Sequence, residues 1–208
     1  ALAAPLGLDV WIGLPTSEHP RVASIYPGRT GEQPPGERRF YEAFGDRASL
    51  TARSFSSPKG LHAVADMNDP AVWSVGYPAM GGLASARGLA AFYAFLAIGG
   101  ACAGTRFFRE DMVAAMGTTV VQGPDQVLLR ETAFAMGFMK DPVGPDGHKQ
   151  RQLFGPNTRA FGHPGAGGSL AFADPDTGIG FAYVMNQMER SVFPTEKTLG
   201  LVRCLYGE

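Results

Sequence analysis

The stretch that decides how this sequence folds is Phe161-Gly162-His163-Pro164-Gly165-Ala166-Gly167-Gly168-Ser169. One histidine precedes a run of small residues, and an alternating strand pattern follows at once. The spacing Gly165-x-Gly167 does not indicate a dinucleotide-binding loop, because position 170 is leucine and a strand follows where a helix would be needed. We therefore interpret the stretch as a strand that opens onto glycine-rich backbone, where small residues let another group lie against the strand.

The residues after this stretch predict a β-hairpin and a closing helix. Apolar residues alternate on both sides of Asp174-Pro175-Asp176-Thr177-Gly178, a sequence typical of a tight turn. With a further alternating segment at Ala133–Met139, this predicts three antiparallel strands of one sheet between Ala133 and Asn186. A helix from about Pro194 should pack on that sheet. The apolar residues concerned are Leu170 and Phe172, then Phe181, Tyr183 and Met185, and in the helix Leu199, Leu201, Val202 and Leu205.

The earlier part of the chain predicts helices separated by irregular segments. Ser85 to Ile98 is the strongest helix, because Ser85 is a good N-cap, apolar residues recur at helical spacing, and Gly99-Gly100 supplies a stop. Other segments are less regular. We expect short helices within residues 40–50 and over Phe108–Met116, a strand at Gln126–Leu129, an irregular segment at 54–82, a surface loop at 13–39 and a polar loop at 140–159.

Composition excludes several classes of function. Hydrophobic residues make up 45% of the 208 residues and charged residues 18%, as expected of a protein with a real core. The net charge is −1 with no basic stripe, which argues against a nucleic-acid partner. No apolar run approaches the roughly 18 residues that a membrane span needs. Cys102 and Cys204 lack metal-ligand spacing, and whether they pair is left open.

Three motifs, which follow one another along the chain in the family's order, carry a resemblance to a known family. The stretch around His163 is similar to the third motif of penicillin-recognising enzymes, where Lys-Thr-Gly or His-x-Gly lines the active site. Pro5-Leu6-Gly7-Leu8-Asp9 resembles the Pro-Leu-Gly-(Leu/Met) segment of these hydrolases. Gly81-Gly82-Leu83-Ala84-Ser85-Ala86-Arg87 resembles their Gly-Gly-Leu-x-Ser-Thr-x-Asp helix start, with Gly88 where Asp is common.

The resemblance implies an α/β (α+β) fold of the β-lactamase type, shared by family VIII esterases, class C β-lactamases and penicillin-binding proteins. The chain is expected to be the C-terminal portion, residues 1–208, of such a domain. Residues 1–125 would be mostly helices and loops, and residues 126–208 the C-terminal strands and terminal helix. Ala1 to Leu8 are typical of the end of a helix, so we expect the chain to begin inside a larger unit.

The resemblance also assigns roles around the third motif. His163 takes the Lys place, Pro164 the Thr place and Gly165 the Gly place, and Ala166 would supply an oxyanion-hole N–H. Pro164, Gly165 and Gly167 would line the substrate. Pro164 lacks the hydroxyl and the N–H that Thr would offer, so contacts made from that hydroxyl are not expected. An imidazole is mostly neutral at neutral pH, so a neutral donor at His163 would favour uncharged esters over anionic β-lactams.

The family nucleophile, a Ser in Ser-x-x-Lys at a helix start, is expected to be absent from this chain. The literal match Ser56-Ser57-Pro58-Lys59 is rejected, because Pro58 and Gly60 spoil the helix that must place Lys below Ser, and because its order is wrong. No Tyr-x-Asn occurs. The other histidines, His19, His62 and His148, have no metal spacing.

The expected function is therefore part of a serine hydrolase that transfers acyl groups from ester or β-lactam-like substrates through an acyl-enzyme. No cofactor and no metal are expected. A small acyl substrate is the expected ligand, and the chain should associate with itself or with a missing N-terminal half. The alternatives are a non-catalytic β-lactamase-like binding protein and a D-alanyl-D-alanine peptidase. This chain alone is expected to be inactive.

Overall fold

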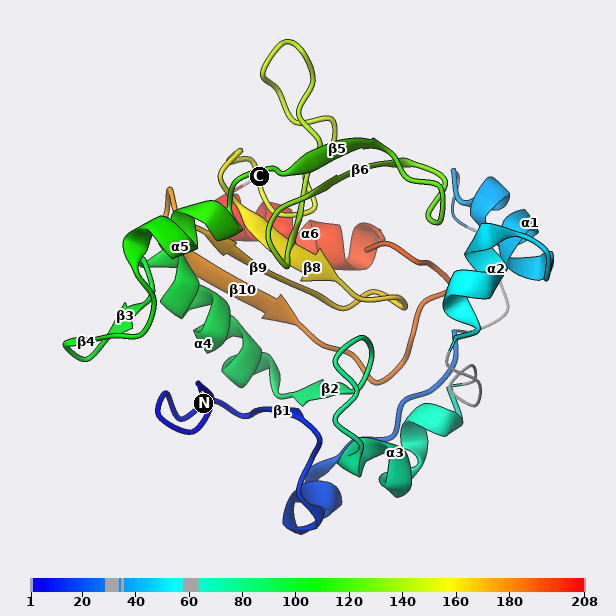
Figure 1. Cartoon of the computed structure of the whole chain (residues 1–208), viewed down its shortest axis with the longest axis horizontal. Coiled ribbons are helices and arrows are strands. Elements are labelled where there is room, and N and C mark those ends of the chain that lie inside the picture. The colour runs from blue at the N-terminus through cyan, green and yellow to red at the C-terminus, as the bar shows by residue number, and fades with distance from the viewer. Residues whose placement is uncertain (1, 29–33, 35, 58–63, 208) are drawn as a thin grey trace.

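The computed structural model describes residues 2–28, 34, 36–57 and 64–207, and its centre is a six-stranded antiparallel sheet in the order β10-β9-β8-β7-β6-β5 (Figure 1). Two two-stranded sheets, β1 with β2 and β3 with β4, accompany it. The strands are β1 (Val10–Ile12), β2 (Gly82–Ala84), β3 (Ala101–Cys102), β4 (Thr105–Arg106), β5 (Val121–Pro124), β6 (Glu131–Phe134), β7 (Met139–Lys140), β8 (Phe161–Pro164), β9 (Leu170–Asp174) and β10 (Ile179–Tyr183).

Helices cover both faces of the central sheet, with α4 on one side and α6 on the other (Figure 1). The mixed helix-and-sheet architecture agrees with the fold class expected from the sequence. The helices are α1 (Arg38–Gly45), α2 (Leu50–Phe55), α3 (Pro70–Ser74), α4 (Ala86–Ala97), α5 (Glu110–Met116) and α6 (Glu196–Tyr206), with short 3-10 helices at Thr16–Arg21 and Asp66–Asn68.

Strand β9 is buried on both faces, and its alternate side chains belong to two different hydrophobic clusters. Leu170 and Phe172 join the cluster that includes Val202 of α6. Ala171 and Ala173 join the cluster that includes Leu96 of α4. Because successive side chains of a strand point to opposite faces, large residues fill the α6 side while alanines leave room for a close helix on the α4 side.

Helix α4 approaches β10 so closely that Gly180 has no space for a side chain. A Cβ atom built on Gly180 would lie 2.0 Å from the backbone nitrogen of Ala94 and 2.5 Å from the carbonyl oxygen of Ala90. The Ser85 side chain caps this helix by accepting a hydrogen bond from the Gly88 N–H, as the sequence predicts. The predicted helix and the hairpin β9–β10, closed by the turn at residues 174–178, are both confirmed.

Two predicted strands are wrong in detail. Gln126–Leu129 is a turn, because the Asp125 side chain accepts hydrogen bonds from the N–H groups of Val127 and Leu128, and the strand lies earlier, at β5. Ala133–Met139 is not one strand: β6 and β7 are joined by a tight turn in which the Ala135 N–H donates to the Phe138 carbonyl at 2.8 Å. The region 133–186 therefore contributes five strands, and not three, to the sheet.

The two segments predicted as polar or surface loops contain buried residues. In 140–159, Lys140, Asp141 and Phe154 are all buried, because this segment folds under the sheet and its charges are paired there. In 13–39, where a 3-10 helix stands at Thr16–Arg21, Leu14 and Glu37 are buried. Segment 54–82 includes α3, which begins after an Asp69 cap. The polar composition of these segments did not indicate which residues are buried, since buried polar groups are stable once they are hydrogen-bonded.

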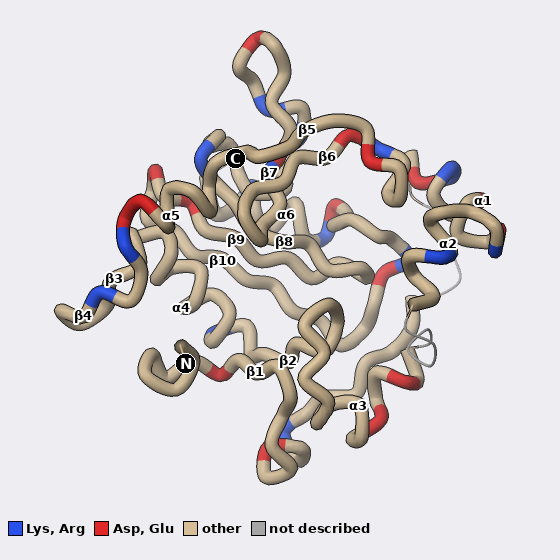
Figure 2. Tube along the Cα trace, in the orientation of Figure 1, with Lys and Arg blue, Asp and Glu red and all other residues tan. Residues whose placement is uncertain are grey.

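Charged residues lie mainly on loops and helix ends around the sheet, without a continuous stripe of one sign (Figure 2). Within the described residues, no helix is both long and apolar enough to cross a membrane. Cys102 and Cys204 are both exposed and free, so they do not form a disulfide in this structure.

The close contact between α4 and β10 predicts the effect of a single methyl group. Gly180→Ala should lower the free energy of unfolding by about 1–3 kcal/mol, because the new Cβ meets backbone that cannot rotate away. Gly123→Ala on β5 is the control, since a Cβ there meets nothing within 4 Å. Urea unfolding of both variants tests this, and equal effects of the two substitutions would contradict it.

Candidate active site

Strand β8 presents His163 at the sheet surface. Phe161, Gly162 and Pro164 are buried, whereas His163 is exposed. Its partner across the ladder is Ala171 of β9, a residue of the α4 face. The strand thus holds one imidazole outward from a rigid backbone.

The tautomer of His163 follows from its neighbour. Nδ1 lies 2.7 Å from the Pro164 carbonyl oxygen, and a carbonyl only accepts hydrogen bonds, so Nδ1 carries the hydrogen. In the neutral ring, Nε2 then offers a lone pair. The expectation of a neutral donor toward an acyl group therefore changes: neutral His163 can accept a hydrogen bond or a proton at Nε2, and it donates from Nε2 only when protonated.

The site loop, residues 165–169, turns the chain from β8 into β9. The Gly165 N–H donates to the Ser169 carbonyl at 2.7 Å, and the Gly168 N–H donates to the Gly165 carbonyl at 3.1 Å. Gly167 and Gly168 have φ of +91° and +110°, values that L side chains rarely adopt. Ala166 is exposed, and no residue in the described part of the chain accepts a hydrogen bond from its N–H. That donor is free to meet a ligand.

Residues 188–193, here called the strap, run from β10 toward α6 and hold the site loop. The Gly167 N–H donates to the Ser191 carbonyl, and the Gly167 carbonyl accepts from the Glu189 N–H, both at 2.8 Å. Met188 packs so tightly that a Cβ on Gly167 would lie 2.7 Å from its Cε atom. From α6, the buried Thr198 hydroxyl donates to the Gly168 carbonyl at 2.8 Å. No local pattern in the sequence marks these supports, so the sequence did not predict them.

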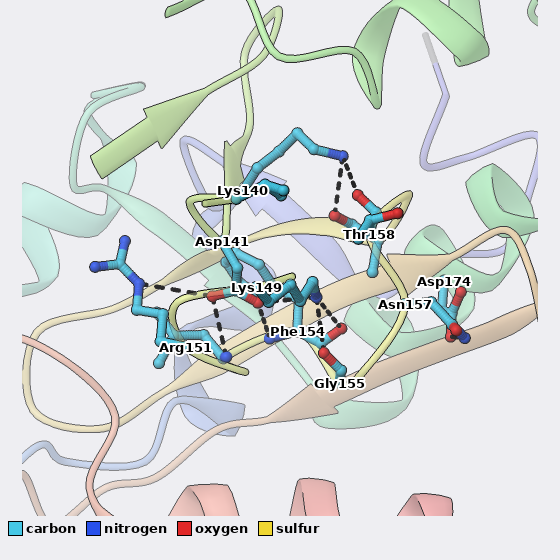
Figure 3. Close-up of polar contacts among 12 residues, drawn as sticks. Lys140, Asp141, Lys149, Arg151, Phe154, Gly155, Asn157, Thr158 and Asp174 are labelled. Atoms are coloured by element: carbon cyan, nitrogen blue, oxygen red, sulfur yellow. Dashed lines mark hydrogen bonds and ion pairs between the residues drawn. The ribbon is translucent and has the colours of Figure 1, made fainter. Parts of the chain in front are cut away.

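Buried Lys140 supports the segment that leads into β8. Its Nζ donates to the carbonyl oxygens of Gly117, Thr158 and Ala160, at 2.6, 2.9 and 3.3 Å (Figure 3). Burial, and then the neighbouring charge of Lys149, lower the pKa of Lys140 to about 8. All three carbonyls belong to backbone, so this ammonium group joins the residue after α5 to the loop that leads into β8.

Asp141 organises a second buried cluster beneath the same sheet (Figure 3). Its carboxylate accepts from the N–H groups of Leu153 and Phe154, both at 3.1 Å, and pairs with Lys149 at 3.0 Å. Lys149 also donates to the Gly155 carbonyl at 2.7 Å. These bonds make the 140–159 segment part of the framework behind β8.

Asp174 and Asp176 do not form an acid–base pair. Asp174 accepts from the Tyr206 hydroxyl at 2.7 Å and from the Asn157 amide at 2.8 Å, and Asp176 pairs with Arg159. Burial opposes ionisation of Asp174, but these hydrogen bonds outweigh it and hold its pKa below the usual range. The turn interpretation of this pair is therefore the one that the contacts support.

The Ser-x-x-Lys match at 56–59 lies partly outside the described residues, which leave out Lys59. Ser56 itself follows the last residue of α2 and donates weakly, at 3.4 Å, to the Arg53 carbonyl. It therefore stands at a helix end and not at a helix start. In the described ranges, no group of three or more His, Cys, Asp or Glu residues is placed to hold a metal ion.

Comparison with known proteins gives consistent matches. The β-lactamase family model matches residues 1–202. The esterase/β-lactamase LipL of Mycobacterium tuberculosis is 31% identical over 191 residues, which cover 90% of this chain and 41% of LipL. A penicillin-binding protein homologue from Caulobacter crescentus (34% identity, TM-score 0.75) aligns with 99% of this chain and 50% of its own. A family VIII carboxylesterase (30% identity, TM-score 0.77) aligns with 98% and 48%. The chain thus spans about half the length of these relatives.

The lowered pKa of Lys140 predicts how stability depends on pH. The folded pKa, about 8, lies below the ordinary 10.5, so between these values the unfolded state binds more protons and stability rises with pH. Lys140→Met lacks this titration but keeps every other group. The difference in unfolding free energy, wild type minus variant, should therefore grow from pH 8 to pH 10. Denaturant titrations at several pH values measure it, and a difference that stays flat would refute the prediction.

Proposed function

Because the chain belongs to the β-lactamase family, we propose that residues 163–167 form one wall of an acyl-transfer site that acts on esters. The free N–H of Ala166, held on a turn that two other segments brace, is the observation that carries the proposal. Its hydrolase relatives, named as esterases and β-lactamases, support the reaction class.

The chemistry of such a wall follows from what the backbone offers. In acyl transfer, negative charge develops on the carbonyl oxygen of the substrate, and a pre-positioned N–H stabilises that charge without reorganising. Ala166 would supply this donor, with Pro164, Gly165 and Gly167 as the small residues against which the substrate lies. His163, exposed one strand position before Pro164, would face the acyl or leaving group.

Substrate preference would follow from His163 standing where relatives of the penicillin-recognising type carry Lys. A lysine holds a full positive charge that attracts a carboxylate, whereas an imidazole is mostly neutral at neutral pH. With Nδ1 bonded to Pro164, the free Nε2 lone pair would suit proton transfer better than carboxylate binding. We therefore propose uncharged esters as the preferred substrates.

The nucleophile would come from outside residues 1–208. We use "complete enzyme" for these residues together with the segment that supplies it. Strand β10 is an outer strand of the central sheet and only partly buried, so its backbone can pair with another strand. We propose that this edge associates with the remaining part of the enzyme or, when that part is absent, with a second copy of the chain.

If the nucleophile comes from outside this chain, as proposed, residues 1–208 alone should not hydrolyse esters or β-lactams, since oxyanion stabilisation and binding alone would remain. The measurement is p-nitrophenyl ester turnover by the purified chain, with light scattering to follow association. Burst kinetics that Ser56→Ala abolishes would overturn the prediction. A sharp monomer would count against the proposed association.

In the complete enzyme, His163→Ala should lower kcat/KM for a short-chain ester by roughly 10–100-fold, the scale of one lost proton-transfer or positioning contact. His163→Lys should shift preference toward carboxylate-bearing substrates. Ester and β-lactam turnover are compared in wild type and both variants, with His148→Ala, at an exposed histidine outside residues 163–167, as the control. Full ester activity in His163→Ala would show that His163 has only a structural role.

A further inference from the structure

Glu37 is a buried carboxylate that lies far along the chain from the site loop. It stands just before α1, makes no side-chain bond to that helix and is only 6% exposed, although its surroundings in sequence are rich in proline, glycine and charge. A carboxylate is costly to bury unless hydrogen bonds replace its water. The hydrogen-bond donors around the Glu37 carboxylate therefore indicate its structural role.

Within the part of the chain that the structure describes, the hydrogen-bond partners of this carboxylate belong to the strap. The Ser191 hydroxyl shares its one hydrogen between Glu37 Oε1 at 2.8 Å and the Phe193 carbonyl at 2.6 Å. The Val192 N–H donates to Glu37 Oε2 at 3.2 Å, and the Phe193 N–H is shared between Glu37 Oε1 at 3.3 Å and Ser191 Oγ at 3.2 Å. Ser191 and Phe193 are themselves buried. Three consecutive residues are thus bound to one side chain, across 154 residues of sequence.

The strap is joined to the site loop by backbone hydrogen bonds. Ser191, which donates its hydroxyl to Glu37, accepts the Gly167 N–H with its own carbonyl. Figure 1 shows the chain after β10 running toward α1 and α2 before it turns back to α6. Glu37 therefore stands two hydrogen bonds from Gly167, the residue that follows Ala166.

A cation balances the buried charge without occupying its hydrogen-bonding sites. The Arg130 guanidinium lies 4.0 Å from the centre of the Phe193 ring and interacts favourably with the charge of Glu37. The carboxylate oxygens are left to the strap. Glu37 therefore binds backbone groups of the strap, while Arg130 compensates its negative charge.

We propose that Glu37 is a positioning residue for ester hydrolysis: it fixes the strap and, through Ser191 and Gly167, the direction of the Ala166 N–H. This rests on the function proposed above for Ala166. A misplacement of about 1 Å in such a group can cost up to roughly 100-fold in rate, so a distant anchor can matter to the chemical step.

The first test measures the anchor itself, by amide hydrogen exchange. Glu37→Gln puts an NH₂ donor where an N–H or hydroxyl now donates, and Glu37→Asp withdraws the carboxylate by one carbon. In either variant the Gly167 amide should exchange at least roughly 10-fold faster, with no comparable change in the amides of β9. Glu42→Gln, an exposed residue of the same helix, is the matched control and should change neither.

The second test measures ester turnover by the complete enzyme. The Glu37 variants should lower kcat roughly 10-fold with KM nearly unchanged, because binding is retained while the donor is misdirected. Unchanged Gly167 exchange, or equal acceleration in β9, would overturn the inference, as would a rise in KM alone. The proposed function fails separately, if the complete enzyme does not hydrolyse esters while Gly167 exchange still responds to Glu37.

Discussion

The rest of the structure depends on strand β9 being buried between two helices. Its alanines allow α4 to lie against the sheet, and its larger residues fill the space beneath α6. Gly180 on the neighbouring strand completes the close approach, since any side chain there would meet α4 backbone. A sheet clamped in this way keeps β8 in one place, because interiors this densely packed cannot deform continuously. The position of His163 and of the site loop follows from that clamp.

The site loop is precise because it is held from three directions. The β8–β9 pairing sets its ends, the strap binds both backbone groups of Gly167, and Thr198 of α6 binds Gly168. These contacts satisfy the neighbouring groups and leave the Ala166 N–H without a partner among the described residues. One donor without a described partner, on an exposed residue three positions after His163, is the feature on which the proposed acyl-transfer wall rests.

Buried charge has a different use from the exposed imidazole. Lys140, Asp141 and Glu37 are all bound by backbone groups, so each joins segments that are distant in sequence. Such groups are anchors, because their hydrogen-bonding capacity is largely spent inside the fold. In the described part of the chain, His163 forms a hydrogen bond only from Nδ1, to the adjacent Pro164 carbonyl, and its Nε2 stays available. This difference in remaining capacity separates framework from candidate chemistry.

The sequence by itself determined the elements that depend on local order. These are the capped helix α4, the hairpin β9–β10 with its Asp-Pro-Asp-Thr-Gly turn, the terminal helix and the family to which the motifs point, since capping, alternation and turn chemistry act over a few residues. Only the tertiary structure decided that Ala133–Met139 is a hairpin, that Lys140, Asp141 and Phe154 of the 140–159 segment are buried, and that Glu37 reaches the strap. Those outcomes rest on partners up to 156 residues away, which no local pattern encodes.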